Sequence, residues 1–162
     1  MSTPSHRASN SAGKSSRTKN LTLDLNTAKQ MLPLVRSIVA EIVNTHRRLS
    51  QLAPEQELLD DSRRALNWAG RQRRYALADE IGSAEKTLTG AVAELSALGV
   101  TLIDGNAGQV DFPTRINGRP AAFTWQFGED AVSHWRYTGE DGRRPIPNGW
   151  QSGTPLRYRS EP

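Results

Sequence analysis

The sequence predicts an α+β fold in which a long, coiled-coil-like antiparallel helical hairpin is followed by a small antiparallel β-meander. Apolar residues recur at alternating three- and four-residue steps over residues 25–49 and again over residues 81–98, the pattern of two helices that pack side by side. After Gly99 the period changes to two, as expected for strands. Asn117-Gly118 then separates two such stretches and is typical of a tight β-hairpin turn.

The first helix is expected to begin at Thr22, a good N-cap residue, with Asp24 in its first turn. Pro33 falls inside this helix and predicts a bend, because the apolar pattern continues in phase on both sides of it. Ala53-Pro54 predicts the turn after the helix, since proline suits the first position of a following helix. The residues expected in its seam are Leu25, Ala28, Leu32, Val35, Val39, Ile42, His46 and Leu49.

The second helical stretch is expected to run from Glu55 to Leu98, with Gly99 as its C-terminal cap. Gly70 interrupts this stretch, so that one long helix and two helices broken near Gly70 both remain open; the second alternative gives three helices in all. The residues expected to face the first helix are Ile81, Ala84, Leu88, Ala91, Leu95 and Leu98.

Strands are expected at residues 100–103, 109–116 and 132–138, with a further strand directly after Asn117-Gly118. A two-residue turn there pairs Phe112 with Phe123 and sets one apolar face against the helices. This face carries Val110, Phe112, Ile116, Phe123, Trp125 and Phe127. The loop before the last strand can have two lengths. The longer loop places Trp135 on the packed face and His134 beside Thr124, and the shorter loop exchanges the two positions. The longer loop is favoured because the large indole of Trp135 is expected inside.

Composition divides the chain into one domain with a tail at each end. Residues 1–20 have no Leu, Ile, Val, Phe, Tyr or Trp, which predicts a disordered segment. Four of the 21 basic residues and none of the 17 acidic ones lie there, so this tail is basic and the rest of the chain is formally neutral. Residues 21–99 and 100–138 are expected to form one domain. Residues 139–162, rich in Gly, Pro and Arg, predict an extended C-terminal tail.

Several classes of function are disfavoured by the composition. The chain has no cysteine, which excludes disulfides and thiolate chemistry and fits a reducing compartment. No apolar run approaches the roughly 20 residues that cross a bilayer, so we expect no membrane partner and a cytoplasmic location. No metal-binding spacing accompanies His46 or His134, so we expect neither a metal site nor another cofactor.

The sequence resembles a bacterial family known as domain of unknown function 2203. The matching pieces are Leu21-Thr-Leu23, Met31-Leu-Pro-Leu-Val35, Leu98-Gly-Val100, Val110-Asp-Phe-Pro113, Gly118-Arg119, Trp125, Gly128-Glu129, Trp135 and Gly142-Arg-Arg-Pro-Ile146. The resemblance implies a helical module followed by a small sheet in a prokaryotic protein, with no established activity. In the family pattern a histidine follows the tryptophan at position 135, whereas Arg136 follows it here. A catalytic role for that histidine would therefore be lost in this chain or moved to His134.

An Arg-rich segment is the first candidate site. It comprises Arg63, Arg64, Trp68, Arg71, Arg73, Arg74 and Tyr75. Arginines beside aromatic rings on a helix can hold phosphates while the rings stack on bases. The alternative is a solvated face, because Asp60 lies within helical pairing distance of Arg63 and Arg64. An acidic surface of another protein, including a second copy of this chain, fits the segment equally well.

The polar face of the sheet is the second candidate. It is expected to carry Asp111, Arg115, Thr124, His134 and Arg136. Asp111 and His134 would lie two strand spacings apart, which leaves room for a water or ligand between a carboxylate and a general base. The alternative is a polar face that is simply solvated.

From these observations we expect a non-enzymatic interaction or scaffold module that self-associates through its helical seams, with a protein partner or a second copy bound. The first alternative is an accessory nucleic-acid or ribosome-binding protein that uses the Arg-rich segment. The second is an enzyme that uses the polar sheet face.

Overall fold

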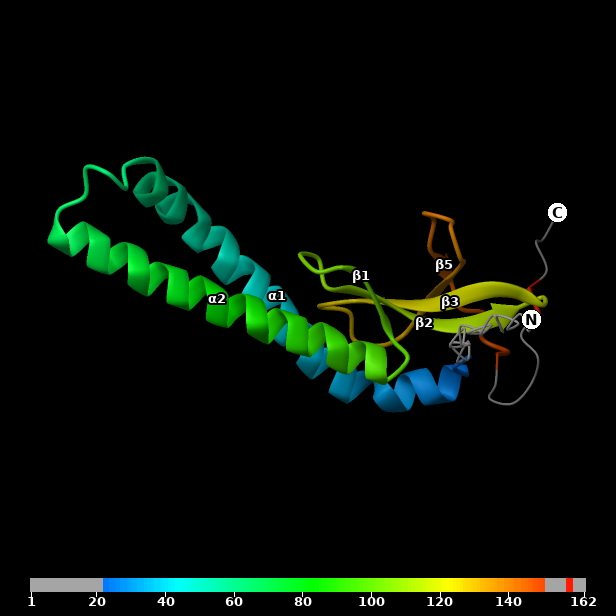
Figure 1. Cartoon of the computed structure of the whole chain (residues 1–162). Helices are drawn as coiled ribbons and strands as arrows, with labels where there is room; N and C mark the ends of the chain where they lie inside the picture. Colours follow the sequence, from blue (N-terminus) through cyan, green and yellow to red (C-terminus); the bar gives the residue numbers. More distant parts are fainter. Residues whose placement is uncertain (1–21, 151–156, 159–162) are drawn as a thin grey trace, which may run out of the picture.

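The computed structural model of the protein describes residues 22–150 and 157–158. It contains two helices, α1 (Leu25–Asp61) and α2 (Trp68–Ala97), followed by one five-stranded antiparallel sheet. The strands lie in chain order and are β1 (Thr101–Asp104), β2 (Gln109–Ile116), β3 (Arg119–Gln126), β4 (His134–Tyr137) and β5 (Arg144–Pro145). The α+β fold, with a helical hairpin before a β-meander, is therefore confirmed (Figure 1). The expected disordered segment, residues 1–20, lies outside the described residues.

The start of α1 differs from the sequence prediction. Asp24, not Thr22, is the N-cap residue, and its Oδ1 accepts a hydrogen bond of 2.7 Å from the Thr27 amide. The two residues before it are extended because the Leu23 amide donates to the Pro113 carbonyl in β2, 2.7 Å away. The helix therefore begins only after the chain has been anchored to the sheet.

The end of α1 also differs, because the helix continues through both Pro33 and Pro54. Figure 1 shows its axis change direction between the blue N-terminal turns and the cyan part, as expected for an internal proline. Pro54 does not end the helix, since it is exposed and the Ser50 carbonyl that loses its partner can bind water. The hairpin turn lies at residues 62–67 instead, where Asn67 caps α2 by accepting a 2.8 Å hydrogen bond from the Gly70 amide. The prediction of a turn at Ala53-Pro54 is thus wrong, and the hairpin has two helices.

The two helices pack along the predicted seams. In α1 the seam is buried from Leu25 to Ile42 and half-buried at His46 and Leu49. In α2 it is buried at Ile81, Ala84, Ala91 and Leu95 and half-buried at Leu88 and Leu98. Val39 and Val43 of α1 also lie against Gly108 in the β1–β2 turn. Helix α1 therefore contacts α2 on one side and the sheet on another.

Helix α2 ends as the sequence predicts. Gly99 has a φ of 78°, and the Val100 amide donates to the Leu95 carbonyl at 3.1 Å, which closes a Schellman cap. The chain then enters the edge strand β1.

The register of the sheet is confirmed. Phe112 pairs with Phe123 across β2 and β3, and the turn between them has positive φ at both Asn117 and Gly118. Trp135 pairs with Phe123 and His134 with Thr124 across β3 and β4. The apolar face is buried against the helices, except that Phe127 is exposed.

Residues 140–150 and 157–158 pack on the sheet where the sequence predicts an extended tail. Within these residues, β5 pairs with β4, with Arg144 opposite Trp135. Trp150 then packs on Trp135 with ring centroids 5.3 Å apart, and Tyr158 packs on the same ring at 4.9 Å. The tail prediction failed here because these contacts join residues far apart in the sequence.

Candidate functional site

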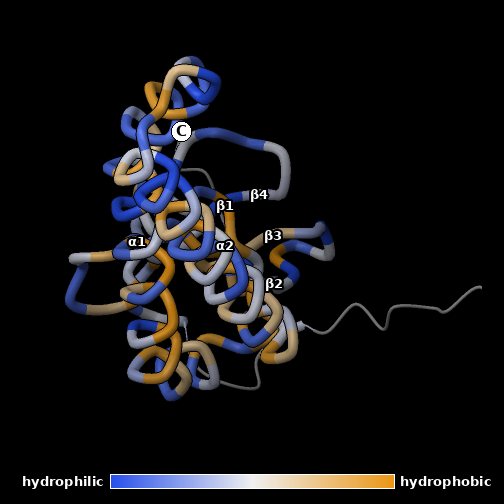
Figure 2. Tube along the Cα trace, turned by 60° about the vertical axis from the view of Figure 1, so that its left-hand side comes forward, coloured by the Kyte–Doolittle hydropathy of each residue, from blue (hydrophilic) through white to orange (hydrophobic). Residues whose placement is uncertain are grey.

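The outer half of the hairpin forms an arm, which we define as residues 46–76. Figure 1 shows that it extends away from the sheet, with the turn at its far end. No residue between Thr45 and Leu77 is buried, although Leu52 and Leu59 keep half-buried positions facing α2. Figure 2 shows the same change in colour, from hydrophobic along the inner part of α1 to mainly hydrophilic toward the turn. The arm therefore contributes surface more than core.

Ion pairs bridge the two helices of the arm. Arg73 donates two hydrogen bonds to the Glu55 carboxylate, at 2.6 and 2.7 Å, and Arg74 donates one to Asp60 at 2.7 Å. At the base of the arm, Arg48 pairs with Glu80. Three ion pairs thus replace the apolar seam, and two predicted binding residues, Arg73 and Arg74, have partners within the chain.

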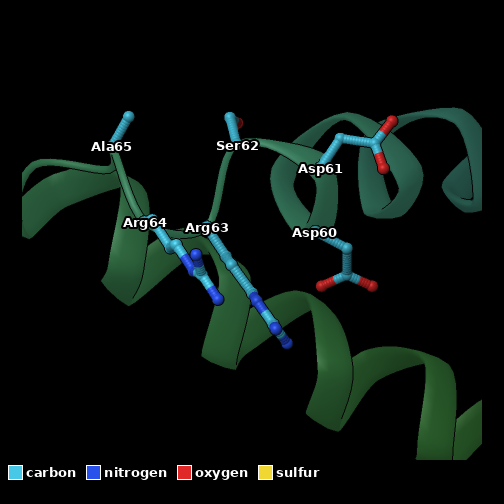
Figure 3. Close-up of a pocket in the computed structure, with 6 residues that line it drawn as sticks. All are labelled: Asp60, Asp61, Ser62, Arg63, Arg64 and Ala65. Carbon is cyan, nitrogen blue, oxygen red and sulfur yellow. The ribbon is translucent and has the colours of Figure 1, made fainter.

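The remaining residues of the Arg-rich segment are free to meet a partner. Arg63 and Arg64 lie in the turn, not on a helix face, and neither pairs with Asp60, whose carboxylate is bound to Arg74. They line an open hollow of about 450 Å³ together with Asp60, Asp61, Ser62 and Ala65. Figure 3 shows Arg63 and Arg64 extending to the same side of the turn as Asp60, and Asp61 pointing to the other side.

Two aromatic rings of the arm lie on the surface of α2. Trp68 is 71% exposed and Tyr75 is 64% exposed, and Arg71 between them is also exposed. On α1, Leu58 is 68% exposed. Tryptophan, tyrosine and arginine are the residues that contribute most to binding energy at protein interfaces. The arm therefore has the composition of a contact surface.

The polar face of the sheet is not open to solvent, contrary to the sequence prediction. Asp111, Thr124 and His134 do lie in one row across β2, β3 and β4. However, Asp111 is only 8% exposed and Thr124 is completely buried. The guanidinium groups of Arg136 and Arg143 lie on them, so that the row is covered from within the chain.

Arg143 joins its own segment to Thr124 in β3 and to Glu129 in the turn after β3. It donates to both oxygens of Glu129, at 2.8 and 2.9 Å, and to Oγ1 of Thr124 at 2.8 Å. Burial alone would raise the pKa of Glu129, but the hydrogen bonds from Arg143 and from the Gln126 amide outweigh it and hold the pKa below its usual range. The sequence analysis named Glu129 and Arg143 within the family-resembling pieces but gave neither a site role; the signal was their opposite charge on the two sides of β4.

Asp111 is bound by arginine and not by histidine. Arg136 donates to its Oδ2 at 2.6 Å, while Nδ1 of His134 lies 3.0 Å from the Ser133 hydroxyl. Burial raises the pKa of the Asp111 carboxyl, and the hydrogen bond from Arg136 only partly offsets this effect. Arg115 lies apart, with a hydrogen bond of 2.7 Å to the Gly118 carbonyl. The structure thus assembles ion pairs here and does not pair Asp111 with His134.

The described residues offer neither a metal site nor a membrane-spanning helix. Within residues 22–150 and 157–158, no three His, Asp or Glu side chains lie close enough to hold a metal ion. Neither described helix contains a stretch that is both long and apolar enough to span a bilayer.

One family model, described as "Uncharacterized conserved protein (DUF2203)", matches residues 22–146. The chain belongs to this family. The matched range includes both helices and all five strands, so the arm and the Arg143 ion pair lie within the family region. In this DUF2203 protein the position after Trp135 is Arg136, which binds Asp111. Searches of curated proteins and of solved structures gave no match.

Proposed function

We propose that the protein is a non-enzymatic interaction module that self-associates, with the arm as its contact surface. The observation that carries this proposal is the exposure of Trp68 and Tyr75 on a projecting hairpin whose helices are already joined by ion pairs. Exposed aromatic residues of this size lose much apolar surface to water when a partner covers them. An arm whose helices are already formed and paired also needs little ordering on binding.

The sheet supports a structural role. The side chains that could have served as acid and base are bound elsewhere, Asp111 to Arg136 and His134 to Ser133. The sheet and the inner hairpin then act as a base that holds the arm.

Charge favours a protein partner over nucleic acid, the alternative function. The arm carries seven arginines and four acidic residues, a net charge of +3. The remainder of α2, residues 77–97, carries four acidic residues and one lysine, a net charge of −3. A phosphate backbone lying along α2 would leave the basic arm and meet this acidic stretch, whereas a second copy supplies both signs.

Sedimentation of the purified protein over a wide concentration series tests the proposal. We expect reversible association that weakens in Trp68→Ala/Tyr75→Ala. The matched control is Leu34→Ala/Phe127→Ala, which removes two exposed apolar side chains away from the arm and should leave association unchanged. A wild-type protein that stays monomeric and copurifies with nucleic acid, seen as a raised ratio of absorbance at 260 to 280 nm, would contradict self-association and favour the alternative.

A further inference from the structure

We infer that α2 binds α2 of a second copy of this chain in an antiparallel arrangement, with the two-fold axis passing beside Gly82. This inference rests on the proposed function and specifies its partner and geometry. It concerns the face of α2 that points away from α1, which we call the outer face.

The outer face is unpartnered along the whole helix. Its central positions recur at seven-residue intervals, and every one of them is exposed. They are Trp68, Tyr75, Gly82, Thr89 and Ser96. No described residue lies within 4 Å of the position that a Cβ atom would take at Gly82 or at Gly90, so no packing within residues 22–150 and 157–158 explains either glycine. Glycine destabilises a helix interior relative to alanine, yet it permits another helix to approach closely.

The sizes of these side chains fit an antiparallel pair. Large residues occupy the N-terminal half of the outer face and small residues the C-terminal half. With the axis at Gly82, Tyr75 of one copy lies opposite Thr89 of the other, and Trp68 lies opposite Ser96. Each aromatic ring then meets a small residue, and the two helices approach most closely where both have glycine. A parallel pair would instead set Trp68 against Trp68 and Tyr75 against Tyr75.

The charges fit the same arrangement. Antiparallel pairing brings the basic arm of one copy, net charge +3, along the acidic part of α2 in the other, net charge −3. Near the axis it places Asp79 beside Lys86, both of which are exposed. A parallel pair would align like charges over the full length of the helix.

The contact has a limited size. Helix α2 has 30 residues, so an end-to-end overlap is about 45 Å long. One helix face of this length gives an interface at the small end of the range for specific complexes. We therefore expect a dimer that dissociates on dilution and weakens in high salt, since part of the attraction is between exposed charges.

Cysteine cross-linking tests the geometry, because the natural chain has no cysteine to interfere. Gly82→Cys should form an intermolecular disulfide under mild oxidation, since the two substituted positions face each other across the axis. Ala93→Cys, on the same exposed face, should not form one, because the two copies of that position are about 33 Å apart in the antiparallel pair. Circular dichroism of both variants checks that they remain folded.

Four outcomes would overturn the inference in distinguishable ways. Disulfides at both positions would mean a parallel pair. A disulfide at Ala78→Cys with none at Gly82→Cys would mean an antiparallel pair in another register. If the protein dimerises and none of the three variants cross-links, the outer face is not the interface, although self-association stands. A protein that is monomeric throughout would refute both proposals.

Discussion

The ion pair between Arg143 and Glu129 is expected to contribute far more to stability than the chemically identical pair between Arg73 and Glu55. Both are bidentate, with donor–acceptor distances of 2.6–2.9 Å. The side chains of the first pair are 22% and 28% exposed, and those of the second are 46% and 39% exposed. The two pairs therefore differ chiefly in burial, and Arg143 has in addition its hydrogen bond to Thr124.

Arg143→Met is expected to lower the free energy of unfolding by about 2–4 kcal/mol. Loss of one partner from a buried ion pair costs about 3–5 kcal/mol, and this pair keeps some access to water. The substitution also removes the donor to the Thr124 hydroxyl, which is completely buried, and an unsatisfied buried group costs about 1–3 kcal/mol. Arg73→Met removes an exposed pair and should leave the free energy of unfolding unchanged within error.

Urea denaturation followed by circular dichroism measures both variants against the wild type. The slope of the free energy against urea concentration should stay the same, so that the midpoint reports stability directly. If Arg73→Met costs as much as Arg143→Met, burial does not decide the strength of these pairs and the account of the covered sheet face is wrong.

Three further predictions concern Glu129, Trp125 and Gly82. The difference in stability between Arg143→Met and the wild type should be full where Glu129 is ionised in both folded proteins. It should shrink as the pH falls through the lowered folded pKa of Glu129, because protonation of this carboxyl removes the ion pair from the wild type; urea titrations at several pH values measure it, and a constant difference would contradict it. Trp125→Ala should lower the free energy of unfolding by about 3–5 kcal/mol, because the indole is completely buried and donates to the Glu129 carbonyl; a cost as small as that of the exposed Phe127→Ala would show that the faces are misassigned. Gly82→Ala should stabilise the dilute, monomeric protein by about 0.5–1 kcal/mol, since its Cβ would meet open space, and a lower thermal midpoint would show that the glycine is needed within the chain.

The parts of the fold that sequence predicts well are those set by neighbouring residues. The helical seams follow from a local repeat, and the register of β2 on β3 follows from Asn117-Gly118, because a two-residue turn fixes every pair in the hairpin. The position of the hairpin turn was missed because Pro54 fits the start of a helix and an exposed position inside one equally well by local criteria. The position of the turn shows only in contacts between distant residues, such as that of Glu55 with Arg73, 18 residues further on.

The covered sheet face was missed for a related reason. The alternation of residues separates Asp111 and Thr124 from the apolar face, but it does not show what lies above them. Their cover comes from Arg136 and from Arg143, and the second lies beyond the last long strand in a Pro-rich segment that resembles a tail. A polar residue on a strand therefore shows which side of the sheet its side chain is on, but not whether that side is exposed to solvent.

The structure places the surface available for self-association outside the helical seams. The sequence suggested the helical seams, but the seam of α1 is buried on α2, and the side of α1 next to it lies on the sheet through Val39 and Val43. Its outer half pairs with α2 through charged residues, which leaves the seam unavailable there as well. Of the two described helices, only α2 has an outer face that combines exposed aromatic rings, small residues and both signs of charge. An interface between copies therefore requires no opening of the hairpin, and association should leave the helical content of the protein unchanged.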